Sequence, residues 1–143
     1  MRAKTISVLQ PVTAGYIAGL IDGEGTITLT RIHRNECRRL VVSISNNELA
    51  LLQFVRNVVG AGRITCKRTY DLRHARSYAY QVSSRQALDL LRQTAHLLRS
   101  YKAARAHLAL AEYVRLTPRN GKYGPELRER RSEFEAKFLA IRA

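Results

Sequence analysis

The stretch that decides the fold reads Gly15-Tyr16-Ile17-Ala18-Gly19-Leu20-Ile21-Asp22-Gly23-Glu24-Gly25. Gly15, Gly19 and Gly23 are spaced four residues apart, so on a helix they share one face with Ala18 beside them. Each glycine inside a soluble helix costs roughly 1 kcal/mol relative to alanine, so such a strip needs a compensating contact. Close helix packing supplies one, because backbones without side chains can approach closely. We therefore expect this segment to be a helix that packs against a second copy of itself about a two-fold axis.

Two acidic residues, Asp22 and Glu24, stand at the C-terminal end of this predicted helix. A helix C-terminus carries about −0.5 charge, so acids there are disfavoured unless a cation is near. Grouped carboxylate oxygens suit Mg²⁺, which takes one or two carboxylates and completes its shell with water and phosphate oxygens. On their own, the two acids are equally consistent with a metal site and with a structural arrangement in which Asp22 caps a turn and Glu24 is merely solvated. The charge of the remaining chain favours the metal-binding interpretation.

The chain is strongly basic. Its 143 residues hold 25 Lys and Arg against 11 Asp and Glu, a formal net charge of +14. Residues 26–85 contain eleven of these basic residues and only three of the acidic ones, which gives a local net charge of +8. Most of these basic residues lie in or beside segments that read as strands. Because 45% of the residues are apolar, the charge does not imply disorder. A basic face built from strands favours nucleic acid as the partner.

Other sequence features indicate a single intracellular domain over residues 1–143. No uncharged apolar run of about 18 residues is present, which excludes a membrane span, and no apolar segment follows Met1 as in a secretory signal. Cys37 and Cys66 stand alone without metal-ligand spacing, so we expect reduced thiols, with Cys66 buried on the inward side of its strand. The expected location is the cytoplasm of a bacterium or an archaeon, or an organelle.

The hydrophobic periods predict a helix, two strands, a helix, two strands and then further helices. Alternation predicts strands at about 26–30, 39–45, 63–69 and 77–83. Helical spacing predicts helices at about 12–23, from Asn46 or Asn47 to 60–62, at 85–98, at 102–116 and from Pro125 onward. Two consecutive strand pairs favour an α+β fold of order αββαββα, with a four-stranded twisted antiparallel sheet and extra C-terminal helices.

Residues 17–25, Ile-Ala-Gly-Leu-Ile-Asp-Gly-Glu-Gly, resemble the signature of the LAGLIDADG homing endonucleases. They depart from it at Ile for Leu, Gly for Ala and Glu for Asp, which are common variants in that family. With one motif copy, the chain resembles the single-motif, homodimeric members. The resemblance implies an intron-encoded endonuclease that hydrolyses one phosphodiester per strand of a long, pseudo-palindromic site in double-stranded DNA. It also implies a water activated by Mg²⁺, with Mn²⁺ as a plausible substitute.

The resemblance assigns roles to individual residues. Glu24 matches the metal-binding acid, and the carbonyl of Gly23 matches a backbone ligand. Asn46 matches a polar residue that orders active-site water, although it can equally be a helix N-cap. Lys102 matches a lysine near the scissile phosphate, where an ammonium offsets developing charge, although it is also one base among many. The implied catalytic set is Glu24, Lys102 and Asn46, and the implied dimer interface is Gly15, Ala18, Gly19 and Asp22.

Strand alternation predicts the surface that reads DNA. Side chains that point away from the core would face the major groove, where Arg pairs with guanine and Gln with adenine. These side chains are Thr28, Thr30, Arg39, Ser43, Arg63, Thr65, Lys67 and Gln81. Arg34 and Arg68, at hairpin turns, are expected to contact phosphates, which position the protein without specifying sequence.

A non-catalytic nucleic-acid binder on the same scaffold is the competing class, either a maturase that binds intron RNA or a DNA-binding regulator. The joint presence of Asp22, Glu24 and Lys102 favours the nuclease, because a pure binder has no need of an acid that faces phosphate. The role of residues 119–143 stays open between packing and extra phosphate contact.

Overall fold

The computed structural model of the chain describes residues 5–67, 73 and 76–143. Its elements run in the order α1 (Pro11–Glu24), β1 (Gly25–Thr30), β2 (Arg39–Asn46), α2 (Leu49–Val59), β3 (Arg63–Lys67), β4 (Ser77–Ser83), α3 (Ser84–Thr94), η1 (Ala95–Leu97), α4 (Lys102–Glu112) and α5 (Pro125–Ala140). The strands form one four-stranded antiparallel sheet in the order β1-β2-β4-β3. The predicted α+β fold, with its αββαββα order and extra C-terminal helices, is confirmed.

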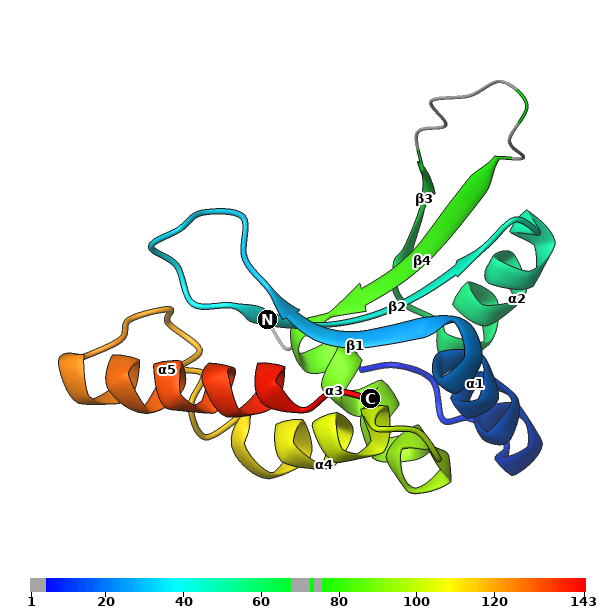
Figure 1. Cartoon of the computed structure of the whole chain (residues 1–143). Helices are drawn as coiled ribbons and strands as arrows, with labels where there is room; N and C mark the ends of the chain where they lie inside the picture. The colour runs from blue at the N-terminus through cyan, green and yellow to red at the C-terminus, as the bar shows by residue number, and fades with distance from the viewer. Residues whose placement is uncertain (1–4, 68–72, 74–75) are drawn as a thin grey trace.

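The helices cover one face of the sheet and leave the other uncovered. Figure 1 shows α3, α4 and α5 beneath β1 and β2, and α1 and α2 on the right of the view. The apolar positions of the strands point to this helical layer and are buried: Ile27, Leu29, Leu40, Val42, Ile44, Tyr80 and Val82. Gly25 allows α1 to turn directly into β1, because a Cβ there would lie 2.6 Å from Cα of Ile21.

Two predicted helices end earlier than their sequence patterns suggest. α3 stops at Thr94, whose hydroxyl donates to the carbonyl of Leu90 at 2.9 Å, and the chain continues as the short 3₁₀ helix η1. α4 ends at Glu112, and the turns that follow are held by the hydroxyl of Thr117, which donates to the carbonyl of Tyr113 at 2.6 Å. Such side-chain hydrogen bonds to the backbone compete with regular helix.

The prediction that Cys66 is buried is wrong, because its side chain is exposed. Cys66 pairs with Tyr78 near the far end of the β3–β4 pair. There the strands extend past α2 (Figure 1), so the inward-facing side of the sheet is not covered by a helix. Alternation sets the side of the sheet to which a residue points, but burial also needs a covering layer.

The C-terminal helix α5 has a packing role. Arg131 is 1% exposed, and its guanidinium donates to the carbonyls of Leu116 and Arg38 and lies 4.7 Å from the ring centroid of Tyr113. Glu135 accepts a hydrogen bond from the backbone N–H of Arg38 at 2.7 Å. These contacts fix the start of β2, so α5 supports the sheet from below. None of the helices in the described ranges is long and apolar enough to cross a membrane.

Candidate active site and nucleic-acid interface

The end of α1 lies beside the end of β2 and brings Glu24 next to Asn46. Because Gly25 pairs with Ile44 in the sheet register, the residues on either side of this pair run close together. Nδ2 of Asn46 donates a hydrogen bond to Oε2 of Glu24 at 2.5 Å, and Oδ1 of Asn46 accepts one from the backbone N–H of Glu48 at 2.8 Å. Asn46 is therefore held at both ends of its amide, and it orients an exposed carboxylate.

A second group of contacts fixes the end of α1 from the helical layer. Nζ of Lys102 donates to the carbonyls of Ile21 and Asp22 at 2.8 and 2.9 Å, and this lysine is 8% exposed. The last turn of α1 contains no basic residue of its own, so Lys102 supplies the cation that a helix C-terminus favours. The Asp22 carboxylate accepts hydrogen bonds from the backbone N–H of Arg99 at 2.8 Å and from the hydroxyl of Ser100 at 2.6 Å.

The charges of this group depend on its burial and its hydrogen bonds. Burial lowers the pKa of Lys102, and the charge of Asp22 partly offsets this effect. Burial raises the pKa of Asp22, but hydrogen bonds from Ser100 and Arg99 and the charge of Lys102 outweigh it, so the net shift of this pKa is downward. Asp22 is therefore an ionised carboxylate that accepts hydrogen bonds from its own chain, which gives it a structural role.

The oxygen atoms at the end of α1 fit a hard divalent cation. Glu24 is exposed, and the adjacent residue Gly23, whose carbonyl is the other expected ligand, is exposed too. Carboxylate and carbonyl oxygens are the ligands that Mg²⁺ prefers. Within the described residues, no group of three or more His, Cys, Asp or Glu side chains is placed to hold an ion. A cation at Glu24 would therefore need further oxygens from water, from phosphate or from another chain.

The glycine strip of α1 faces away from the body of the chain. A Cβ added at Gly15, Gly19 or Gly23 would meet nothing within 4 Å. Ala18, next to Gly19 in the sequence, is only 1% exposed and packs into the core, so its expected place at a helix–helix interface does not fit the structure. The carboxylate of Asp22 also makes its hydrogen bonds within the chain, with the backbone N–H and the hydroxyl of Ser100.

Exposed apolar side chains flank this open strip. Val12 is 85% exposed, and the rings of Tyr16 and Phe54 meet edge to face with their centroids 5.8 Å apart. Together with Thr13 and Leu51 they line one shallow hollow between α1 and α2. Sequence reasoning missed Val12 and Phe54, because both fit the apolar stripe of an ordinary buried helix face.

The predicted base-reading residues share the uncovered face of the sheet. The register aligns Thr26, Ser43, Gln81 and Arg63 in one row across all four strands, and it runs without a bulge. By the same alternation, Thr28, Thr30, Arg39, Thr65 and Lys67 point to this face. None of the strand residues on this face is acidic. The face combines Arg, Lys and Gln with small hydroxyl side chains, which can hydrogen-bond to base edges and phosphates.

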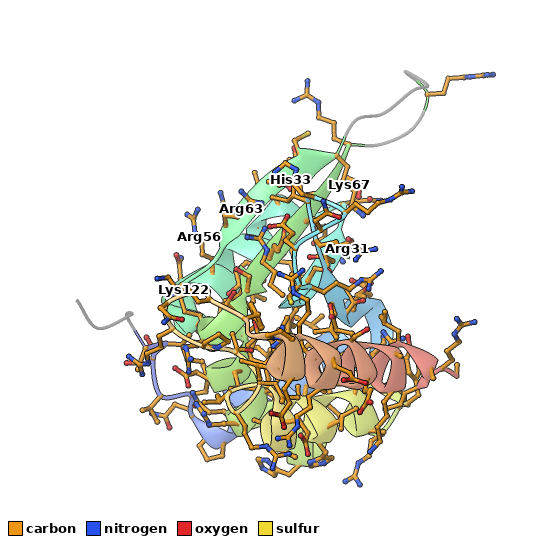
Figure 2. The ribbon with its side chains drawn as sticks, turned by 90° about the vertical axis from the view of Figure 1, so that its left-hand side faces the viewer. Arg31, His33, Arg56, Arg63, Lys67 and Lys122 are labelled. Atoms are coloured by element: carbon orange, nitrogen blue, oxygen red, sulfur yellow. The ribbon has the colours of Figure 1, made fainter. Side chains whose placement is uncertain are left out.

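The loop 31–38 adds positive charge beside this face. Glu36 accepts hydrogen bonds from the backbone N–H groups of Ile32 at 3.0 Å and His33 at 2.6 Å, and the bond from His33 is the largest of the effects that lower the pKa of Glu36. Arg34 is exposed in this turn, as expected for a phosphate contact, whereas Arg68 lies outside the described residues. Figure 2 shows Arg31, His33, Arg63 and Lys67 on the part of the molecule formed by the strands and their loops.

Fold and site together define a class. An αββαββα domain whose first helix carries the Ile17–Gly25 signature and ends in an acid beside an antiparallel sheet has the fold of the LAGLIDADG homing endonucleases. The chain is similar to the homing endonuclease I-CvuI, solved with its DNA target in the presence of calcium, at a TM-score of 0.74 and 17% identity, over 92% of this chain and 83% of that one.

Two further solved structures show the same fold. The archaeal intron-encoded homing endonuclease I-Vdi141I, in complex with DNA, matches at a TM-score of 0.71 and 18% identity, over 92% of this chain and 85% of that one. The LAGLIDADG homing endonuclease I-GzeII, in complex with its DNA target, matches at a TM-score of 0.68 and 15% identity, over 95% of this chain but 45% of that one. No protein-family model matches the sequence, and no curated protein matches it.

Proposed function

We propose that this chain is a site-specific DNA endonuclease of the LAGLIDADG type, which acts as a homodimer and hydrolyses one phosphodiester in each strand of a long, pseudo-palindromic site. The observation that carries the proposal is the exposed carboxylate of Glu24, which Asn46 holds at the edge of a basic sheet face without acidic strand residues. An acid placed beside a surface suited to DNA would repel phosphate, unless it holds a cation there.

Glu24 and the carbonyl of Gly23 would hold Mg²⁺, with Mn²⁺ as a substitute. When bound, such a cation supplies positive charge to the phosphate and lowers the pKa of a water molecule. Asn46 orients the Glu24 carboxylate through its 2.5 Å hydrogen bond. Lys102 neutralises the carbonyl end of α1 through its two hydrogen bonds, and on the family pattern it adds positive charge near the scissile phosphate.

The homodimer is supported by the open glycine strip. Packing two α1 helices through Gly15 and Gly19 would cover backbone that is otherwise exposed, and Val12, Tyr16 and Phe54 would extend the contact with apolar side chains. A two-fold axis along this contact would bring two copies of Glu24 to the same end of the interface. One carboxylate per chain would then serve each DNA strand.

Binding to double-stranded DNA is supported by the shape and charge of the sheet. I-CvuI, I-Vdi141I and I-GzeII, which share the fold, were solved in complex with DNA. A twisted antiparallel sheet can enter the major groove. The row of Thr26, Ser43, Gln81 and Arg63 would then lie across the groove, with Arg39 beside it.

A cleavage selection tests this proposal. The protein is incubated with a randomised duplex library in Mg²⁺, and both the cut ends and the bound, uncut molecules are sequenced. A palindrome-like consensus among the cut ends is the expected result. A consensus in the bound fraction alone would contradict the enzyme and indicate a DNA-binding regulator. No enrichment in either pool would contradict DNA as the target and favour structured intron RNA.

A further inference from the structure

Two adjoining hollows extend the basic surface from the sheet to the segment that follows α4. The first, of about 350 Å³, lies over the strands and is lined in part by Arg39, Arg63 and Gln81. The second, of about 400 Å³, lies between the end of β4 and the segment after α4, and is lined in part by Arg85 and Arg119. Both are lined by Ser83 and Gln86, so they adjoin, and neither lining includes an acid.

The segment 117–124, the last part of the connection from α4 to α5, forms a hydrogen-bonded turn, and its residues Thr117, Pro118 and Arg119 line the second hollow. The backbone N–H of Gly121 donates to the carbonyl of Pro118 at 3.3 Å, and that of Lys122 donates to Oδ1 of Asn120 at 3.0 Å. Gly121 has a φ of 69°, the left-handed conformation that glycine adopts without strain. This turn presents the exposed side chains of Arg119 and Lys122.

The base of this turn is fixed to the rest of the fold. The carbonyl of Thr117 accepts a hydrogen bond from the guanidinium of Arg85 at 3.2 Å, and its hydroxyl accepts one from Arg131. Arg131 also holds the carbonyl of Arg38, where β2 begins. The turn is thereby tied both to α3 and to the strand that carries Arg39. Figure 2 shows Lys122 below Arg63, where the strands give way to the helical layer.

We propose that segment 117–124 is a phosphate-binding arm, which extends the DNA surface past the sheet through Arg119 and Lys122. This inference rests on the proposed function, because it takes DNA as the ligand. The hollow offers guanidinium groups and hydroxyls, which recognise phosphate oxygens whatever the base sequence. Two exposed basic side chains on a hydrogen-bonded turn lose less conformational freedom on binding than the same side chains on a disordered tail. The arm would therefore add affinity and register, but no base preference.

The test is the salt dependence of DNA binding by the double variant Arg119→Ala/Lys122→Ala. Each neutralised phosphate changes the slope of log K against log salt by about −0.9. In the proposed homodimer the variant removes two contacts from each chain, so the slope should become shallower by about 3.6. The variant should bind every duplex more weakly by a similar factor and select the same consensus as the wild type. Ethylation interference should lose phosphate contacts at the outer ends of the site.

Arg130→Ala/Lys137→Ala is the matched control. It removes the same charge from side chains that line the hollow between α4 and α5, in the helical layer. An arm variant with the slope of this control would overturn the inference, whereas binding and cleavage of duplex DNA by the wild type would leave the proposed function standing. A changed consensus would also overturn it, because the arm would then read bases. A wild-type chain that binds no duplex DNA would overturn both proposals.

Discussion

Nδ2 of Asn46 lies 2.5 Å from Oε2 of Glu24, although the two residues are 22 positions apart in the chain. One residue ends β2 and the other ends α1, and the pairing of Gly25 with Ile44 sets them side by side. The orientation of the Glu24 carboxylate is thus a consequence of the sheet register. A group that is positioned by the fold before binding avoids part of the entropic cost of assembling a site.

We expect Glu24→Gln to abolish cleavage and to leave DNA binding equal or tighter. The amide has nearly the shape of the carboxylate but lacks the charge that would hold a cation, so the cleavage rate should fall by at least about 10²-fold. Binding should not weaken, because a negative charge near phosphate is removed. Single-turnover cleavage and a gel-shift titration measure the two effects. A variant that cuts at the wild-type rate would contradict the metal-ligand role.

Asn46→Ala should lower cleavage by about 10 to 100-fold, the usual effect of removing a residue that orients a metal ligand. DNA binding and thermal stability should change little, because Glu24 is exposed and Asn46 is only partly buried. The control is Asn47→Ala, which removes the same amide from the neighbouring, exposed position. Equal activities of the two variants would show that the hydrogen bond to Glu24 has no catalytic consequence.

The fold, and the place of the candidate site at the end of the first helix, could be predicted from the sequence because they depend on local patterns. Alternation at Ile27 and Leu29 and the glycine spacing at Gly15 and Gly19 each need only a few neighbouring residues. The tertiary surroundings of single residues could not be predicted in this way. Cys66 follows the inward alternation but lies where no helix covers the strand, and Ala18 shares a helix with the glycines but packs into the core.

The contacts of Lys102 could not be predicted either, because nothing near it in the sequence indicates that its ammonium group binds the C-terminal end of α1. We expect Lys102→Met to destabilise the fold by about 1.5 to 3 kcal/mol, the usual cost of losing hydrogen bonds from a charged group. The carbonyls of Ile21 and Asp22 would lose their partner. The midpoint of urea unfolding measures this loss, with the exposed Lys137→Met as control. Equal midpoints for the two variants would contradict the helix-end role.

Asp22 should make stability depend on acid pH. Its pKa in the folded chain is below the ordinary value of 3.8, so its ionised form favours folding at higher pH. This contribution is complete above the unfolded pKa and is lost as the pH falls through the folded pKa, that is, below about pH 4. Asp22→Asn should be less stable than the wild type at neutral pH, and the difference should shrink on acidification. Urea midpoints from about pH 6 down to pH 2 test the sign. A difference that is constant with pH would contradict it.

A substitution in the open glycine strip of α1 tests whether the chain forms the proposed dimer. Because a Cβ at Gly19 meets nothing within 4 Å in the single chain, Gly19→Leu should fold, and the leucine should add helix propensity of roughly 1 kcal/mol. In a dimer built on this strip the same side chain would lie between two backbones and force them apart. We therefore expect Gly19→Leu to be a folded monomer with lowered cleavage of palindromic sites, as measured by sedimentation at micromolar concentration. Ala136→Leu, at an exposed position of α5, is the control for added apolar surface. A Gly19→Leu dimer as stable as the wild type would contradict the α1 interface.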